Sequence, residues 1–187
     1  MPDTEQNAPL RLSISAAPEL RLRVAADIIA SATAHAVQIT TAESCTGGLI
    51  MGALTDIPGS SAVIDRGFIT YSNTAKARLL NVPAQTLRDH GAVSEPTVQA
   101  MATGAAQLAN AQISIAVSGI AGPGGGSAEK PVGTVCFGFV LPDADANTLV
   151  RTQTCLFDGA DRSIIRAQSV HYALQIVHDH LHSMAQE

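Results

Sequence analysis

The stretch that decides the fold is residues 37–54, which read VQITTAESCTGGLIMGAL. It opens with a β-branched run, Val37 to Thr41, of the kind that forms a buried strand. Small polar residues follow from Glu43 to Gly48, and the apolar residues from Leu49 to Leu54 then favour a helix. The stretch therefore predicts a strand, a turn and a helix, with polar side chains at the turn.

Outside this stretch, helices and strands continue to alternate. Helices are expected to begin at Glu19, at Thr74 and after the capping residue Ser94, and a long helix from Asp161 closes the chain. Strands are expected, in chain order, at 62–71, 113–118, 132–140 and 148–157. Helices between strands predict an α/β fold, a three-layer α/β/α single domain. The late hairpin makes the sheet mixed, although mostly parallel. We assign residues 19–187 to this domain and residues 1–18 to a flexible N-terminal segment.

Composition excludes several functional classes. The 187 residues are 46% hydrophobic and 14% charged, which supports a sizeable core and argues against disorder. A net charge of −5 disfavours nucleic acid as a main ligand, because a phosphate backbone requires a basic face. No apolar run is long enough for a membrane span, and the N-terminus lacks the order of a signal peptide. The three cysteines fit no zinc motif and are expected to be free thiols, which favours a cytoplasmic protein.

Ser44 is the first candidate for chemistry. It lies where the predicted strand gives way to a helix, so the backbone N–H groups after it can face a bound anion or an oxyanion. These N–H groups belong to Cys45, Thr46, Gly47 and Gly48, which we predict to contact the substrate. Two alternatives stay open. Ser44 can merely cap the helix, and Cys45 can be the nucleophile, since a helix N-terminus also lowers a thiol pKa.

A glycine-rich loop at 119–127 is the second candidate. Its backbone N–H groups can form an anion-binding nest, with Gly122, Gly124 and Gly125 as the expected contacts. The loop matches neither a P-loop nor a dinucleotide-binding fingerprint. A flexible surface loop is the equal alternative.

Lysine is rare in this chain, which has only Lys76 and Lys130. Lys76 lies just beyond the strand predicted at 62–71, on the first turn of a helix, and is either a functional lysine or an ordinary solvated one. Ser127 and Lys130 formally read S-x-x-K. That motif requires a helix, which the preceding glycines and the following Pro131 disfavour.

The final helix supplies arginine and histidine candidates. Arg162 and Arg166 are four residues apart, so they share a face and can grip a phosphate or a carboxylate. Pairing with nearby surface aspartates is the equal alternative. His178 and His182 have the same spacing, but no H-E-x-x-H pattern accompanies them, so a solvated helix face is favoured over a metal site. We therefore expect no metal.

Five ordered motifs give the chain a resemblance to a known family. They are Ala42–Gly48, Tyr71–Asn73 with Lys76, Gly91–Glu95, Ser118–Pro123 and Lys130–Val135. Together they closely resemble the CinA C-terminal-domain family, from about residue 19 to residue 182. Stand-alone members of that family look like nicotinamide-nucleotide amidases, which hydrolyse the carboxamide of nicotinamide mononucleotide to the acid and ammonia. Some relatives carry a further N-terminal domain, for which residues 1–18 are too short.

The resemblance implies a serine nucleophile at Ser44 and a lysine base at Lys76, without a metal or other cofactor. Tyr71 is a further catalytic candidate, because it is an alternative base, as is His90. Asn73, in the same motif as Tyr71, is a candidate substrate contact. Amide hydrolysis by a serine needs a base, an oxyanion site and an acid for the departing ammonia, and these residues can supply them.

The resulting expectation is a cytoplasmic, homo-oligomeric amidase that acts on a small nucleotide in pyridine-nucleotide salvage, with no nucleic-acid or membrane partner. Two alternatives stay open: a catalytically silent nucleotide-binding module of the same fold, and an amidase for another small amide. A partner-binding role in DNA uptake or damage response is suggested only by the family's name.

Overall fold

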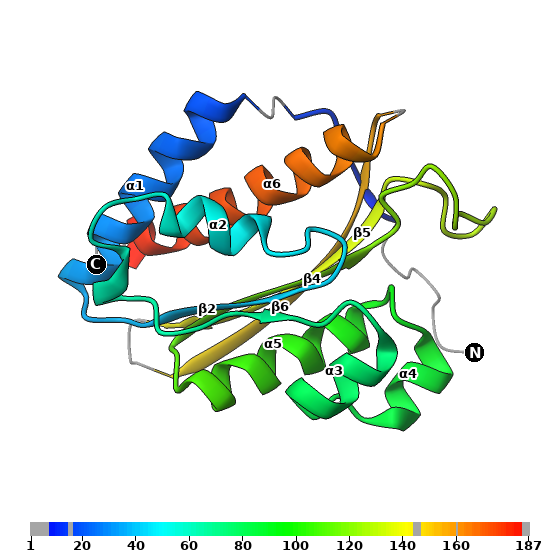
Figure 1. Cartoon of the computed structure of the whole chain (residues 1–187), viewed down its shortest axis with the longest axis horizontal. Coiled ribbons are helices and arrows are strands. Elements are labelled where there is room, and N and C mark those ends of the chain that lie inside the picture. Colours follow the sequence, from blue (N-terminus) through cyan, green and yellow to red (C-terminus); the bar gives the residue numbers. More distant parts are fainter. Residues whose placement is uncertain (1–7, 15–16, 144–146, 160, 185–187) are drawn as a thin grey trace.

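The protein is built in three layers. The computed structural model describes residues 8–14, 17–143, 147–159 and 161–184, and in it a six-stranded sheet lies between two groups of helices (Figure 1). One face carries α1 (Pro18–Ala34), α2 (Leu49–Thr55) and α6 (Arg162–Met184). The other carries α3 (Asn73–Leu80), α4 (Ala84–His90) and α5 (Glu95–Ala109). The predicted three-layer α/β/α class is confirmed.

The sheet is mixed and mostly parallel, as predicted. Its spatial order is β1 (Leu10–Leu12), β6 (Thr148–Phe157), β5 (Thr134–Pro142), β4 (Ile113–Gly119), β2 (Ile39–Glu43) and β3 (Phe68–Ile69). Among the described strands only β5 runs against the others, because it pairs antiparallel with both β4 and β6. β2 and β4 are parallel neighbours, so Ser44 and the glycine-rich loop both follow strands at the same edge of the sheet. Ligands of α/β sheets bind at such edges.

Apolar side chains fill both interfaces between the sheet and the helices. Tyr172 of α6 joins a ring cluster with Phe137, Phe139 and Phe157 of the sheet, in which neighbouring centroids lie 4.8 to 6.2 Å apart. On the other face α5 approaches the end of α3 closely at Gly104. A Cβ at that position would lie 2.0 Å from the Leu80 carbonyl oxygen, so only glycine fits.

Three local features differ from the sequence-based expectations. The strand predicted at 62–71 is too long, because a 3₁₀ turn at Ser60–Ala62 and exposed residues from 65 to 67 leave only Phe68–Ile69 in the sheet. α4 was not predicted, since it buries no side chain and so has no apolar stripe. β1 was not predicted either. It lies within the segment expected to be flexible, and it pairs in parallel with β6.

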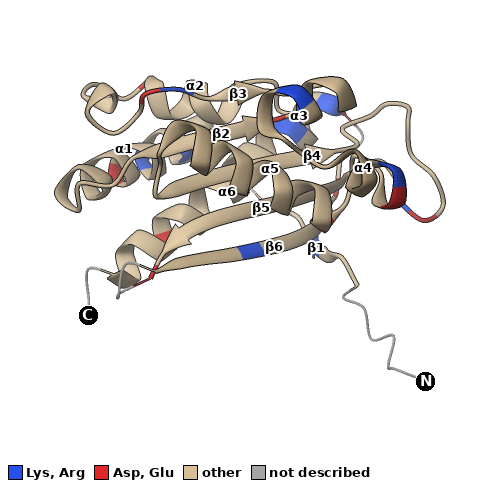
Figure 2. Ribbon diagram, turned by 90° about the horizontal axis from the view of Figure 1, so that it is seen from below, with Lys and Arg blue, Asp and Glu red and all other residues tan. Residues whose placement is uncertain are grey.

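No helix in the described ranges is both long and apolar enough to cross a bilayer. Charged residues are sparse on the ribbon, and in the view of Figure 2 the Lys and Arg positions are spread over several elements without forming one stripe. This distribution agrees with the low charged fraction of the sequence.

Candidate active site

Ser44 is the first residue after β2, at a sharp turn before α2. Its amide extends the pairing of β2 with β4 by donating to the Val117 carbonyl oxygen at 3.0 Å. Gly47 and Gly48 follow with φ of +64° and +98°, a left-handed conformation that glycine adopts without a steric penalty. The turn fixes Ser44 at the C-terminal edge of the sheet, where its side chain is nearly buried.

The buried carboxylate of Glu43 binds the start of α2. Oε2 accepts hydrogen bonds from the amides of Gly48 (2.9 Å) and Ile50 (3.1 Å), and Oε1 accepts one from Met51 (2.8 Å). A buried charge is tolerated only when such bonds replace its water. The N-terminal cap of α2 is Gly48, and the side chain that satisfies its amides is Glu43. The alternative in which Ser44 merely caps this helix is therefore wrong.

Lys76 brings a second functional group to Ser44. α3 begins after its capping residue Ser72, and Lys76 and Leu80, four residues apart, are its buried side chains. Lys76 Nζ donates to Ser44 Oγ at 3.0 Å and to the Thr70 carbonyl oxygen at 2.8 Å. The side chain is 1% exposed, so the alternative of a solvated lysine is wrong. Burial lowers the pKa of Lys76, because the ammonium form loses its hydration.

Cys45 is a poor rival for the role of nucleophile. Burial raises the pKa of its thiol to about 12, and the carboxylate of Glu43 adds to this effect. The neighbouring backbone N–H groups and Lys76 act in the opposite direction, but they do not outweigh burial. The reactive form of cysteine is the thiolate, so the structure favours Ser44.

Two arginines on the first turns of α6 reach toward this edge of the sheet. Arg166 donates from Nε to the Cys45 carbonyl oxygen (3.1 Å) and from Nη2 to that of Thr46 (2.8 Å). Arg162 donates from Nη1 to the Gly122 carbonyl oxygen and from Nη2 to the Tyr71 phenol, each at 3.0 Å. The helix thus joins the turn after β2, the segment after β3 and the loop after β4. The hydrogen bonds found for both arginines go to these groups and not to Asp158 or Asp161, the alternative partners left open by the sequence.

The predicted substrate contacts are only partly brought together. Gly122 is buried at the base of the glycine-rich loop, whereas Gly124 and Gly125 are exposed farther along it. Asn73 is exposed at the first position of α3, and Tyr71 is 62% exposed. Among the four residues after Ser44, the amides of two already have acceptors, because Gly47 donates to the Ser44 carbonyl oxygen and Gly48 to Glu43.

Lys130 anchors the far end of the glycine-rich loop. Its Nζ donates to the carbonyl oxygens of Val93 (2.8 Å) and His90 (3.5 Å), while Ser127 Oγ accepts from the Lys130 backbone amide (3.0 Å). The S-x-x-K reading therefore fails, since the lysine amine reaches away from the serine. His90 takes part through its carbonyl, and its side chain is exposed at the end of α4.

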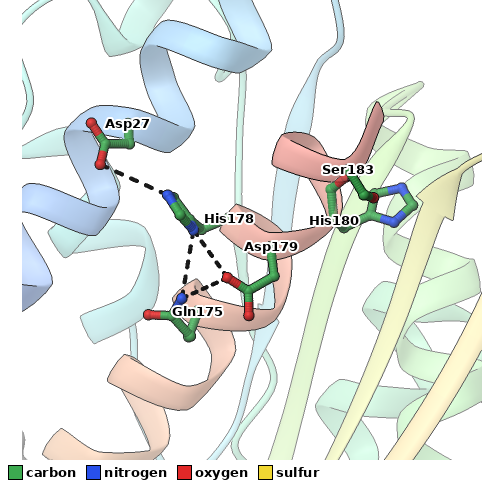
Figure 3. A network of polar contacts seen from close by, with 6 residues as sticks. All are labelled: Asp27, Gln175, His178, Asp179, His180 and Ser183. Atoms are coloured by element: carbon green, nitrogen blue, oxygen red, sulfur yellow. Dashed lines mark hydrogen bonds and ion pairs between the residues drawn. The ribbon is translucent and has the colours of Figure 1, made fainter. Parts of the chain in front are cut away.

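His178 of α6 lies in a separate polar network (Figure 3). His178 Nδ1 is 3.1 Å from Asp179 Oδ1, and His178 Nε2 is 3.8 Å from Asp27 Oδ2 on α1. The rings of His178 and His182 are nearly parallel, with centroids 6.2 Å apart. Over the described residues, no group of three or more His, Cys, Asp or Glu side chains could hold a metal ion.

Comparison with known proteins identifies the family of this chain. Residues 21–181 match the family described as "CinA C-terminal domain". The chain belongs to the CinA C-terminal domain family. This CinA chain is 52% identical over 142 residues to "Nicotinamide-nucleotide amidohydrolase PncC" of Escherichia coli strain K12, a match that covers 76% of this chain and 83% of that protein. The protein of the same name from Enterobacter agglomerans is 56% identical over 137 residues, which cover 73% of this chain and 80% of that protein.

Solved structures agree with the family assignment. The crystal structure of "competence/damage inducible protein CihA from Agrobacterium tumefaciens" is 46% identical to this CinA chain with a TM-score of 0.74, and the match covers 88% of this chain and 95% of that one. The resemblance predicted from five motifs is confirmed.

Two residues of the site were not anticipated from the sequence. Thr70 contributes a backbone carbonyl, which carries no side-chain signal. Glu43 does carry one, because a single acidic residue at the end of an otherwise uncharged strand, directly before a helix, is placed to bind the helix amides. The carbonyl partners of Arg166 likewise follow from the tertiary structure alone.

Proposed function

We propose that this chain hydrolyses the carboxamide of nicotinamide mononucleotide to nicotinate mononucleotide and ammonia, in pyridine-nucleotide salvage. The observation that carries the proposal is the 3.0 Å hydrogen bond between Lys76 Nζ and Ser44 Oγ, two groups that are almost excluded from water. The relatives named nicotinamide-nucleotide amidohydrolase support the choice of substrate.

In the proposed reaction Ser44 is the nucleophile and Lys76 the base. Neutral Nζ takes the proton of Ser44 Oγ while that oxygen attacks the carboxamide carbon. The resulting ammonium gives its proton to the amide nitrogen, the C–N bond breaks, and ammonia leaves an ester on Ser44. Water then attacks the ester, again losing a proton to Lys76, and the acid departs as Ser44 regains its proton. The lowered pKa of Lys76 makes the neutral amine accessible at lower pH than in water.

Tyr71 is the third catalytic residue of the proposal. Its oxygen accepts a hydrogen bond from Arg162, so its own hydrogen can point toward the leaving nitrogen. The oxyanion is assigned to the amides of Cys45 and Thr46, because the amides of the two glycines that follow are already bonded within the turn.

The phosphate of the nucleotide is assigned to the glycine-rich loop, with Gly124 and Gly125 as backbone donors, and Asn73 is assigned as a further contact to the substrate. Arg162 lies at the base of this loop and is exposed. Its two observed bonds use two of the five N–H groups of a guanidinium, which leaves others for a phosphate.

Ammonia release from three substrates tests the proposal: nicotinamide mononucleotide, its riboside and nicotinamide, each assayed in the presence of EDTA. We expect the nucleotide to exceed the riboside at least about a hundredfold in kcat/KM, because charge-assisted contacts to phosphate contribute about 1.5–3 kcal/mol each. Ser44→Ala should abolish turnover. Equal rates for nucleotide and riboside would refute the phosphate site.

Other outcomes of the same assay separate the alternatives. Tight binding of the nucleotide without ammonia release would indicate a catalytically silent nucleotide-binding module. Release of ammonia only from a different small amide would change the proposed substrate but not the proposed mechanism.

We also propose that the protein is cytoplasmic, which its free cysteines favour, and that it forms a homo-oligomer. Cell fractionation and sedimentation test these two points.

A further inference from the structure

We infer that Arg166 is a positioning residue for the nucleophile, and that its guanidinium fixes the backbone of the turn that carries Ser44. The inference rests on the proposed role of Ser44. It gives Arg166 a task different from the phosphate contact that its place on the final helix suggested.

The turn after β2 is held from two sides by groups of opposite charge. On the N–H side, the Glu43 carboxylate accepts from Gly48 and from the first turn of α2. On the C=O side, the carbonyl oxygens of Cys45 and Thr46 accept from Arg166 at 3.1 and 2.8 Å. These are the carbonyls of the two residues directly after Ser44, so Arg166 holds the backbone right next to the nucleophile.

Arginine suits this task better than lysine would. Two different nitrogens of one planar group reach two successive carbonyl oxygens, whereas an ammonium is a single point donor. The guanidinium also lies against Gly47, because a Cβ built there would be 3.6 Å from Arg166 Nη2. Arg166 is half-buried, while Arg162, one helical turn earlier, is exposed beside the glycine-rich loop. Of the two arginines, Arg162 is therefore the better placed for a phosphate.

The turn needs such a clamp because it contains two adjacent glycines in the left-handed conformation. Glycine leaves the backbone more conformations than any other residue. Without Arg166 the carbonyls of Cys45 and Thr46 would lose their donors, and Ser44 Oγ could move away from Lys76 Nζ. A misplacement of about 1 Å in an active site costs about a hundredfold in rate.

Steady-state kinetics on nicotinamide mononucleotide and its riboside tests the inference. Arg166→Gln is expected to lower kcat about a hundredfold on both substrates, with KM for the nucleotide within about threefold of wild type. Arg166→Lys should recover part of kcat, since it restores one donor. Arg162→Gln should instead raise KM for the nucleotide more than for the riboside. If Arg166→Gln raises KM for the nucleotide and spares kcat, Arg166 is a phosphate ligand and the inference is overturned.

A second measurement avoids the substrate altogether. A fluorophosphonate ester reacts with an activated serine, and the mass of the intact protein reports its attachment at Ser44. Arg166→Gln should slow this labelling by about the same hundredfold factor, whereas the exposed, distant Arg151→Gln on β6 should not. Thermal unfolding and circular dichroism confirm that each variant is folded. Labelling of Arg166→Gln at the wild-type rate would overturn the inference. A wild type that is labelled at Ser44 but releases no ammonia would refute the proposed substrate and leave the role of Arg166 standing.

Discussion

Replacing Lys76 by methionine should remove the reaction and, at the same time, remove a pH dependence from the stability of the fold. Methionine fills a similar volume without a charge or a basic nitrogen. In the structure Lys76 is 1% exposed. Its Nζ contacts two oxygens, Ser44 Oγ and the Thr70 carbonyl oxygen. Both effects follow from this single buried amine.

The expected loss of activity in Lys76→Met equals the contribution of general-base catalysis, which typically raises a rate by about 10²- to 10⁴-fold. That range corresponds to about 2.7–5.5 kcal/mol in the activation barrier. Lys76→Arg should be almost as inactive as Lys76→Met, because a guanidinium stays charged, while Lys130→Arg should be milder. For wild type, kcat/KM should rise with pH through one ionisation that lies below the ordinary lysine pKa, since burial lowers the pKa of Lys76.

The effect on stability has a definite sign. Because the folded pKa of Lys76 is lowered, the unfolded chain keeps this proton to higher pH than the native protein does. The free energy of unfolding contributed by Lys76 therefore rises with pH between the lowered folded pKa and the ordinary value of 10.5. The rise amounts to about 1.4 kcal/mol for each pKa unit between the two. Lys76→Met lacks this rise, so its stability relative to wild type should fall over that window.

Urea unfolding of wild type and Lys76→Met at several pH values from neutral to alkaline measures that difference. Other groups that titrate there are common to both proteins and cancel in the comparison. The reasoning is refuted if Lys76→Arg is active, or if the stability difference between the two proteins does not change with pH. An active Lys76→Arg enzyme would leave Tyr71 or His90 as the base.

Two further predictions concern single side chains. Cys45→Ser should keep most of the activity, because the wild-type thiol, with its pKa raised to about 12, is not the nucleophile; loss of ammonia release in this variant, with Ser44→Ala still active, would make the protein a thiol amidase. Gly104→Ala should lower the free energy of unfolding by about 1–3 kcal/mol, since the new methyl group meets the Leu80 carbonyl. Gly52→Ala is the matched control, also inside a helix but with open space around it, and should raise that free energy by about 0.5–1 kcal/mol. Equal urea midpoints for the two glycine variants would contradict the close helix contact.

The sequence predicts the architecture well where its patterns are long. β6 begins and ends at the predicted residues, and the helix capped by Ser94 begins where expected, with the Ser94 hydroxyl accepting from the Thr97 amide. The shortest elements are predicted least well, because β1 was not predicted and β3 keeps only two of the ten residues predicted at 62–71. β1 and β3 have three and two residues, too few for any periodicity, and they exist because a neighbouring strand offers unpaired backbone groups.

The candidate site was likewise predictable only in part. Ser44 could be singled out because a strand, a small polar turn and a helix place it at a sheet edge, and Lys76 because lysine is so scarce. Their contact joins residues 32 positions apart and depends on the tertiary packing of α3, which lies against α5. The partners of Arg162 and Arg166 lie up to 121 residues away, and most are backbone oxygens, which sequence composition does not reveal.

Glu43 also bears on product release. The proposed reaction turns a neutral carboxamide into a carboxylate beside Ser44. Unoccupied backbone N–H groups at the start of a helix attract anions, and they would retain this product more strongly than the substrate. In this protein the N–H groups of Gly48, Ile50 and Met51 are already bonded to the carboxylate of Glu43, the residue before the serine. The acid is therefore expected to depart readily, and nicotinate mononucleotide should inhibit no more tightly than the substrate binds, which a comparison of its inhibition constant with KM would test.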